Sequence, residues 1–121
     1  MRILVTGSRE WTDRDAVWGA LLRLSVEVFQ GDHLEPMTLI AGGARGLDTI
    51  ALEIAHRWGW ERERYETEWD EYPRPDRCLA FPLPGSVDTW DMIHKANAAG
   101  IEVRIVPSEQ PQEPHPSKEP K

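Results

Sequence analysis

Two successive units, each a short apolar strand, a glycine-containing turn and an amphipathic helix, constrain the fold of this chain more than any other feature. The first unit occupies residues 2–28 and turns at Gly7, and the second occupies residues 38–58 and turns within 42–46. In both helices apolar residues recur at i, i+4, i+7 and i+11, which places them on one face. Apolar strands that alternate with such helices predict a parallel sheet covered on both faces.

The rest of the chain continues this alternation. Residues 78–81 form a third apolar run, residues 88–99 have a helical pattern, and residues 101–106 alternate like a strand. Residues 61–66 are mostly charged, so a strand there would lie at a sheet edge, where charge blocks unwanted pairing. The sequence therefore predicts a Rossmann-like three-layer α/β domain. Its mostly parallel five-stranded sheet has the order 3-2-1-4-5, right-handed crossovers and helices on both faces.

Composition divides the chain into two parts. We expect residues 1–106 to form one folded domain, which is about the size that a single hydrophobic core supports. Five of the fifteen residues from 107 to 121 are proline, and none is Ile, Leu, Phe or Trp. Such a segment cannot bury enough apolar area to fold, so we expect a disordered or extended tail.

Charge and cysteine content exclude several classes of protein. The chain has 14 Lys and Arg against 21 Asp and Glu, a net charge of −7, which disfavours sequence-independent binding to nucleic acid. The single cysteine, Cys78, excludes an internal disulfide and a Cys-rich zinc site, and the histidines lack metal-ligand spacing, so no metal site is predicted. No apolar run is long enough to span a membrane and the first residues do not resemble a signal peptide, so we expect a cytoplasmic protein.

The glycine-containing turns indicate where a ligand would bind. In a parallel sheet, the turns that follow the strands emerge at the carboxyl edge, and ligands bind there at the point where the strand order reverses. In the predicted order the first and fourth strands are neighbours, so Gly7 and Gly85 would face each other beside the turn at 42–46. A missing side chain lets backbone N–H groups approach an anion, and the N-terminus of the next helix adds donors and a positive dipole end.

We therefore expect a phosphate of the ligand on the backbone of Gly7-Ser8 and residues 43–46. Arg9 and Arg45 would be its counter-charges, and nearby hydroxyl groups would bind phosphate or ribose. The predicted ligand-binding residues are Thr6, Gly7, Ser8, Arg9, Trp11, Gly42, Gly43, Ala44, Arg45, Gly46, Asp48, Pro84, Gly85, Ser86 and Thr89.

Several of these residues have a second interpretation that the sequence leaves open. Gly42-Gly43 would turn the chain in any case, and a lone arginine such as Arg9 is typical of a solvated surface. Asp48 suits the first turn of a helix, and it would repel phosphate unless it accepts from a ribose hydroxyl or orients Arg45. Trp11 would either stack on a base or pack as a hydrophobic staple near the helix start.

Two common nucleotide-binding motifs are missing. The chain has no G-x-x-x-x-G-K-[ST], and its first turn has one glycine in place of G-x-G-x-x-G. These differences argue against a P-loop enzyme and against an ordinary NAD dehydrogenase, and no cofactor is predicted.

Three segments together resemble a known family. They are Arg2–Arg9 followed by Trp11, residues 41–46 followed by Asp48, and residues 79–81 leading to Pro84-Gly85. In this order they resemble the YspA-related members of the SLOG superfamily, which includes the LOG cytokinin-activating phosphoribohydrolases, lysine decarboxylase-like proteins and the DNA-processing protein A. The resemblance spans nearly all of residues 1–106. It implies a Rossmann-like sheet that binds a nucleotide, or a nucleotide-derived ligand such as an ADP-ribose-like molecule, in a bacterial or phage sensor that is often a homo-oligomer.

The chain departs from the LOG motif P-G-G-x-G-T-x-x-E. Pro84-Gly85 and Thr89 match it, whereas Ser86 and Asp88 replace glycines. Met92 stands where the LOG enzymes have a glutamate that is implicated in cleaving the N-glycosidic bond. A segment that related proteins carry before the third apolar strand is also missing. The chain therefore resembles a trimmed member that binds its ligand and has lost part of the catalytic motif.

The sequence leaves three functions open. The first is a nucleotide-binding module. The second is a phosphoribohydrolase-type N-glycosidase, for which Asp88 and Asp91, with Asp48, are the candidate catalytic acids. The third is a protein-interaction module that uses the tryptophans and the Pro-rich tail, and exposed tryptophans also fit a homo-oligomer interface. DNA processing ranks last because the sequence shows no basic track.

Overall fold

The computed structural model describes residues 1–30, 36–43, 45–64 and 74–107. It confirms the predicted fold, because five parallel strands form one sheet in the order β3-β2-β1-β4-β5. The elements in chain order are β1 (Arg2–Gly7), α1 (Arg14–Gln30), β2 (Thr38–Ala41), α2 (Leu47–Arg57), β3 (Glu61–Arg64), β4 (Arg77–Phe81), α3 (Val87–Ala98) and β5 (Glu102–Ile105). The end of the predicted edge strand, 65–66, and residues 108–121 of the predicted tail lie outside the described residues.

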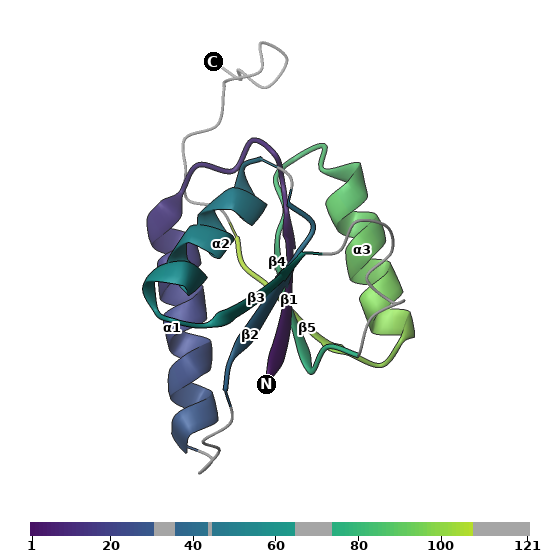
Figure 1. The fold of residues 1–121 in the computed structure, drawn as a ribbon. Helices are drawn as coiled ribbons and strands as arrows, with labels where there is room; N and C mark the ends of the chain where they lie inside the picture. Colours follow the sequence, from purple (N-terminus) through teal and green to yellow (C-terminus); the bar gives the residue numbers. More distant parts are fainter. Residues whose placement is uncertain (31–35, 44, 65–73, 108–121) are drawn as a thin grey trace.

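The sheet separates two layers of helices, as Figure 1 shows. α1 and α2 cover one face, and α3 covers the other. The central strand β1 alternates its side chains between these layers: Ile3 and Val5 belong to the core under α1 and α2, and Leu4 belongs to the core under α3. Because both faces are covered, residues 3–5 of β1 are continuously apolar and do not alternate with polar residues.

The apolar residues that recur at helical spacing in the sequence form the packing faces of α1 and α2. α1 buries Val17, Leu21 and Leu24, and α2 buries Leu47 and Ile54. Each fully buried side chain of this size contributes about 1.5–3 kcal/mol of transfer free energy. The larger of the two cores, between the sheet and α1 and α2, therefore supplies most of the stability that holds the carboxyl edge in place.

The charged strand β3 lies at an edge of the sheet. Glu63 of this strand pairs with Arg2 of β1 across β2: Arg2 Nη1 and Nη2 donate to Glu63 Oε2 and Oε1 at 2.5 and 2.9 Å. These hydrogen bonds from the guanidinium hold the pKa of Glu63 below its usual 4.5. The pair ties the edge strand to the centre of the sheet.

We expect Glu63→Gln to lower the free energy of unfolding by about 1 kcal/mol at about pH 7. Because the pKa of Glu63 is depressed in the folded chain, the contribution of its carboxylate is present above pH 4.5 and is lost as the pH falls below that value. Urea unfolding of both proteins at neutral and acid pH measures this difference. Glu53→Gln, which breaks an exposed pair with Arg14, is the control and changes stability less. A difference that persists in acid contradicts the ionic role of Glu63.

Cys78 lies on β4 with 1% of its surface exposed. Burial raises the pKa of its thiol to about 12, so the thiol stays protonated at neutral pH. The side chain packs in the core under α3 as a small apolar group, in agreement with its position in an apolar strand.

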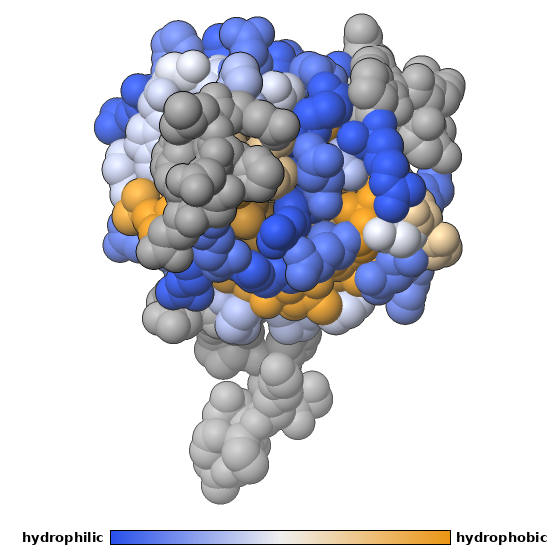
Figure 2. Space-filling model, turned by 90° about the horizontal axis from the view of Figure 1, so that it is seen from below, coloured by the Kyte–Doolittle hydropathy of each residue, from blue (hydrophilic) through white to orange (hydrophobic). Residues whose placement is uncertain are grey.

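Figure 2 shows the face at the amino ends of the strands, opposite the edge where the turns after β1, β2 and β4 lie. Hydrophilic side chains cover most of this face, and hydrophobic side chains appear in separate patches between them. Within the described ranges, no helix is both long enough and apolar enough to cross a membrane.

Candidate functional site

The turns after β1 and β4 form the walls of a cleft at the carboxyl edge of the sheet. These strands are neighbours, yet the chain continues to opposite faces, from β1 into α1 and from β4 into α3 (Figure 1). This arrangement is the topological switch point at which α/β sheets bind ligands. The cleft has a volume of about 410 Å³, which is within the usual range for small-molecule sites.

Most of the residues predicted from these two turns line the cleft. They are Thr6, Gly7, Ser8, Arg9, Pro84, Gly85, Ser86 and Thr89, and the cleft is also lined by Asp48 of α2 and the candidate acid Asp88 of α3. The other candidate acid, Asp91, does not line it. Glu10, Val87 and Met92 also line the cleft and were not among the predicted ligand-binding residues. The first two are chain neighbours of predicted residues, and Met92 lies one helical turn beyond Asp88, so helical spacing was the signal that could have identified it.

Ser8 holds the three turns together through its backbone. Its N–H donates to the carbonyl of Phe81 at 3.2 Å, and its carbonyl accepts from Trp11 N and Leu47 N, both at 3.2 Å. Its hydroxyl oxygen accepts from Glu10 N at 3.0 Å. Ser8 N, one of the phosphate donors that the sequence suggested, therefore already donates to a protein acceptor.

Two glycines allow the turns to approach each other closely. A Cβ on Gly7 would lie 2.7 Å from Leu47 Cβ and 3.0 Å from Phe81 Cβ. A Cβ on Gly46, which has φ 77°, would collide with the carbonyl of Arg9 and lie 2.7 Å from its Cα. The turn after β2 therefore packs directly against the backbone of the turn after β1.

Most of the turn after β2 lies outside the cleft, because it packs against the turn after β1. Gly42, Gly43 and Gly46 do not line the cleft, and Ala44 lies outside the described residues. Gly43 has φ 86°, and a Cβ there would meet the guanidinium of Arg64, with Arg64 Cζ at 2.9 Å. The left-handed backbone conformation and the close contacts therefore account for Gly43 and Gly46.

Arg45 also lies outside the cleft lining. Its Nη2 donates to Glu10 Oε2 at 3.0 Å, and both side chains are about three-quarters exposed, at 75% and 72%. This exposed pair partly neutralises the Glu10 carboxylate at the mouth of the cleft. The structure therefore places the Arg45 guanidinium beside Glu10 at the mouth of the cleft and not in its lining.

Trp11 is a core residue, with 1% of its surface exposed. Its Nε1 donates to the carbonyl of Asp13 at 2.9 Å, and its ring packs edge-on against Phe81, with the centroids 5.3 Å apart. No ring face is available for stacking on a base. Of the two interpretations of Trp11, the structure shows the packing one.

The turn after β4 brings the N-terminus of α3 to the cleft. Gly85 has φ 85°, and a Cβ there would meet nothing within 4 Å, so this wall is open to solvent. Ser86 gives no side-chain cap, because its hydroxyl accepts from Leu83 N at 3.0 Å. In the described chain the N–H groups of Asp88 and Thr89 consequently have no acceptor. Together with the N–H groups of Arg9 and Gly85, for which the described chain likewise has no acceptor, they are backbone donors in the cleft for an anionic or carbonyl oxygen.

The charges that line the cleft are mixed. Arg9 is the one lining guanidinium, and within the described part of the chain it has no ion-pair partner. Glu10, Asp48 and Asp88 are carboxylates, and Asp48 is 93% buried, with an exposed fraction of 7%. No group of three His, Cys, Asp or Glu side chains in the described ranges could hold a metal ion. The cleft can therefore offer one guanidinium cation, the backbone N–H donors of both walls and several acceptors to a ligand.

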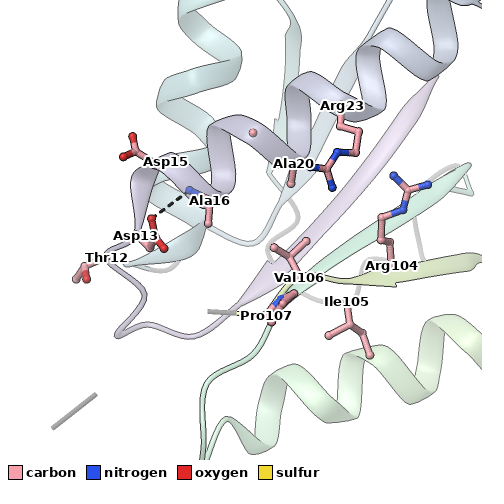
Figure 3. Close-up of a pocket in the computed structure, with 11 residues that line it drawn as sticks. Thr12, Asp13, Asp15, Ala16, Ala20, Arg23, Arg104, Ile105, Val106 and Pro107 are labelled. Atoms are coloured by element: carbon pink, nitrogen blue, oxygen red, sulfur yellow. Dashed lines mark hydrogen bonds between the residues drawn. The ribbon is translucent and has the colours of Figure 1, made fainter. Parts of the chain in front are cut away.

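A second, larger hollow of about 820 Å³ lies between α1 and β5, and the sequence did not predict it. Figure 3 shows Arg23 of α1 and Arg104 of β5 extending into the space between the helix and the strand. Glu27 holds Arg104 through two hydrogen bonds of 3.0 Å, which lower the pKa of Glu27 and raise that of Arg104. At the other end Asp13 Oδ1 accepts from Ala16 N at 3.1 Å and caps α1. This hollow, the α1–β5 groove, lies away from the switch point.

Comparisons with known proteins give a family and a relative. A model of the YspA, cpYpsA-related SLOG family matches residues 1–72. The Gene 61 protein of Mycobacterium phage D29 is 37% identical over 125 residues, an alignment that covers 84% of this chain and 93% of the phage protein. No solved structure matches the chain. The family match includes the β1 wall of the cleft and Asp48.

Proposed function

Because the chain belongs to the YspA, cpYpsA-related SLOG family, we propose that it binds a nucleotide-derived ligand in the cleft between the turns after β1 and β4. One observation carries the proposal: Arg9, which lacks an ion-pair partner in the described chain, and the unpaired N–H groups of Asp88 and Thr89 line the same switch-point cleft. The family suggests a nucleotide-related function, and the cleft supplies the chemistry for it.

The cleft matches the parts of a nucleotide. An anionic group would lie between the guanidinium of Arg9 and the N-terminal N–H groups of α3, where the helix dipole is favourable. The buried carboxylate of Asp48 and the hydroxyl of Thr89, which is 4% exposed, would bind ribose hydroxyls. The role is that of a ligand-binding module or sensor.

The test is a titration with the nucleoside, the 5′-mono-, di- and triphosphate of each common base, and ADP-ribose, followed by calorimetry and by thermal unfolding. We expect at least one compound to bind, and a ligand at 100 times its Kd to stabilise the chain by about 2.7 kcal/mol. Arg9→Ala should weaken this binding about 30-fold, since it removes a charge-assisted hydrogen bond worth about 2 kcal/mol.

Arg23→Ala is the matched control, because Arg23 also has no ion-pair partner among the described residues but lines the α1–β5 groove. It should leave the affinity unchanged. Loss of binding in Arg23→Ala and not in Arg9→Ala would show that the ligand binds in the α1–β5 groove. Failure of every compound to bind would refute the proposed function.

Hydrolysis of the N-glycosidic bond is a second candidate, because the Asp88 and Asp48 carboxylates line the same cleft. Met92 also lines the cleft, at the position that corresponds to the LOG glutamate, and a thioether cannot act as an acid or base. We therefore propose binding without cleavage. Chromatography of incubated nucleoside monophosphates should show no free base, whereas base release that Asp88→Asn abolishes would favour the hydrolase.

A further inference from the structure

A stripe of large apolar side chains on α1 is exposed to solvent. Trp18, Leu22 and Val26 recur at i, i+4 and i+8, and 40%, 47% and 45% of their surfaces are exposed. The face of α1 that packs on the sheet instead buries Leu21 and Leu24, so the fold of one chain leaves the stripe accessible. Exposed apolar residues that gather on one helix in this way are typical of a surface that another protein covers.

Two opposite charges lie on the same solvent side of α1. Asp15 lies in the first turn of the helix and Arg23 lies two turns further along, and both line the α1–β5 groove (Figure 3). Neither side chain has an ion-pair partner among the residues that the structure describes, and Glu27, the acid nearest to Arg23 along the helix, is held by Arg104. Gly19 lies midway between the two charges, which are separated by about 12 Å along the helix axis.

This arrangement is complementary to itself. Suppose that α1 of a second copy lies antiparallel on α1, with the two Gly19 residues facing each other. Asp15 of each copy then lies level with Arg23 of the other, so that two identical ion pairs form, as a two-fold symmetric interface requires. The same register sets each exposed Leu22 level with Ala16, a small side chain, and a Cβ on Gly19 would meet nothing within 4 Å in the single chain, so the two helices can approach closely there.

Charge also selects the direction of the second helix. In a parallel pair with the same residues in register, Asp15 would face Asp15 and Arg23 would face Arg23. Like charges that face each other across an interface disfavour that pairing. The antiparallel pair converts the same four side chains into two attractive contacts.

We propose that the chain forms a homodimer through α1, with the two-fold axis at Gly19. The apolar stripe is buried between the two helices, and an Asp15–Arg23 ion pair closes the interface on each side. The second copy lies along the α1 wall of the α1–β5 groove, away from the switch-point cleft, so this inference does not rest on the proposed ligand.

Sedimentation equilibrium of the full chain over a range of micromolar concentrations tests the interface. We expect the unmodified chain to dimerise, and Leu22→Glu to weaken the dimer about 100-fold or more, since it removes two buried leucine side chains and adds two carboxylates. Trp90→Glu is the control, because it introduces the same charge at a similarly exposed apolar residue of α3, 42% exposed, and should leave the dimer unchanged. Circular dichroism checks that each variant is folded.

Two charge reversals test the antiparallel register. Asp15→Lys and Arg23→Glu should each weaken their own dimer about tenfold or more, because each variant places like charges opposite each other. An equimolar mixture of the two variants should form a heterodimer, since the two reversed charges are complementary across the interface.

Three results would overturn the inference. A chain that stays monomeric throughout the concentration range leaves the apolar stripe to a different partner. A dimer that Leu22→Glu does not weaken has its interface elsewhere on the molecule. A mixture of Asp15→Lys and Arg23→Glu that dimerises no better than either variant alone contradicts the pairing of Asp15 with Arg23.

Discussion

Gly46→Ala should destabilise the chain by about 3 kcal/mol or more, because two costs add at this position. Gly46 has φ 77° and ψ −124°, a backbone conformation that residues with a Cβ avoid. The new Cβ would also collide with the backbone of Arg9, which cannot move aside as a flexible side chain would. Urea unfolding of the substituted and unsubstituted chains measures the loss.

Two other glycines separate these costs. Gly59 has φ 75°, but a Cβ there would meet nothing within 4 Å, so Gly59→Ala should show the conformational cost alone, about 1–2 kcal/mol. Gly19 lies inside α1 with equally open surroundings, and Gly19→Ala should stabilise the chain by about 0.5–1 kcal/mol. Equal losses at Gly46 and Gly59 would contradict the close approach of the turns after β1 and β2.

Trp11→Ala should cost about 3–5 kcal/mol, as large-to-small substitutions of buried aromatic residues do. The ring is 1% exposed and packs edge-on against Phe81, and its Nε1 donates to the Asp13 carbonyl. Its removal leaves a cavity directly beneath the turn that forms one wall of the cleft.

Trp90→Ala is the comparison, because Trp90 is 42% exposed on α3 and should cost no more than about 1 kcal/mol. Thermal and urea unfolding of the two variants give the two values. If Trp11→Ala kept full stability and lost only ligand affinity, Trp11 would be a stacking residue and its described core position would be wrong.

The strands and helices were predictable because local pattern and burial agree in this fold. A parallel sheet buries both faces of its central strands, so residues 3–5 and 39–41 are continuously apolar. β3 was the hardest strand to predict, since at an edge its charged side chains carry no burial pattern. The helix starts shifted by one or two residues because capping depends on side-chain geometry that spacing does not fix.

The candidate site was predictable in position and less so in detail. The order of the strands brings the turns with Gly7 and Gly85 together, and both line the cleft. The role of the turn after β2 was not predictable. A glycine that lets a neighbouring backbone segment approach and a glycine that lets an anion approach look the same in the sequence. Whether Arg45 meets a ligand or Glu10 depends on a long-range contact of two exposed side chains.

The competing α1–β5 groove had no sequence signal for a similar reason. Its walls, such as Ala20 and Arg104, come from elements far apart in the chain and have no shared motif. Only the packing of α1 beside β5 creates it.

The most direct measurement is a titration of the ¹⁵N-labelled chain with a nucleoside monophosphate, followed through the backbone amide resonances. We expect the largest shifts on residues 7–10 and 85–89, above all on Asp88 and Thr89, because their N–H groups gain an acceptor. Shifts confined to the α1–β5 groove, or no shifts with the monophosphate of any common base, would contradict it.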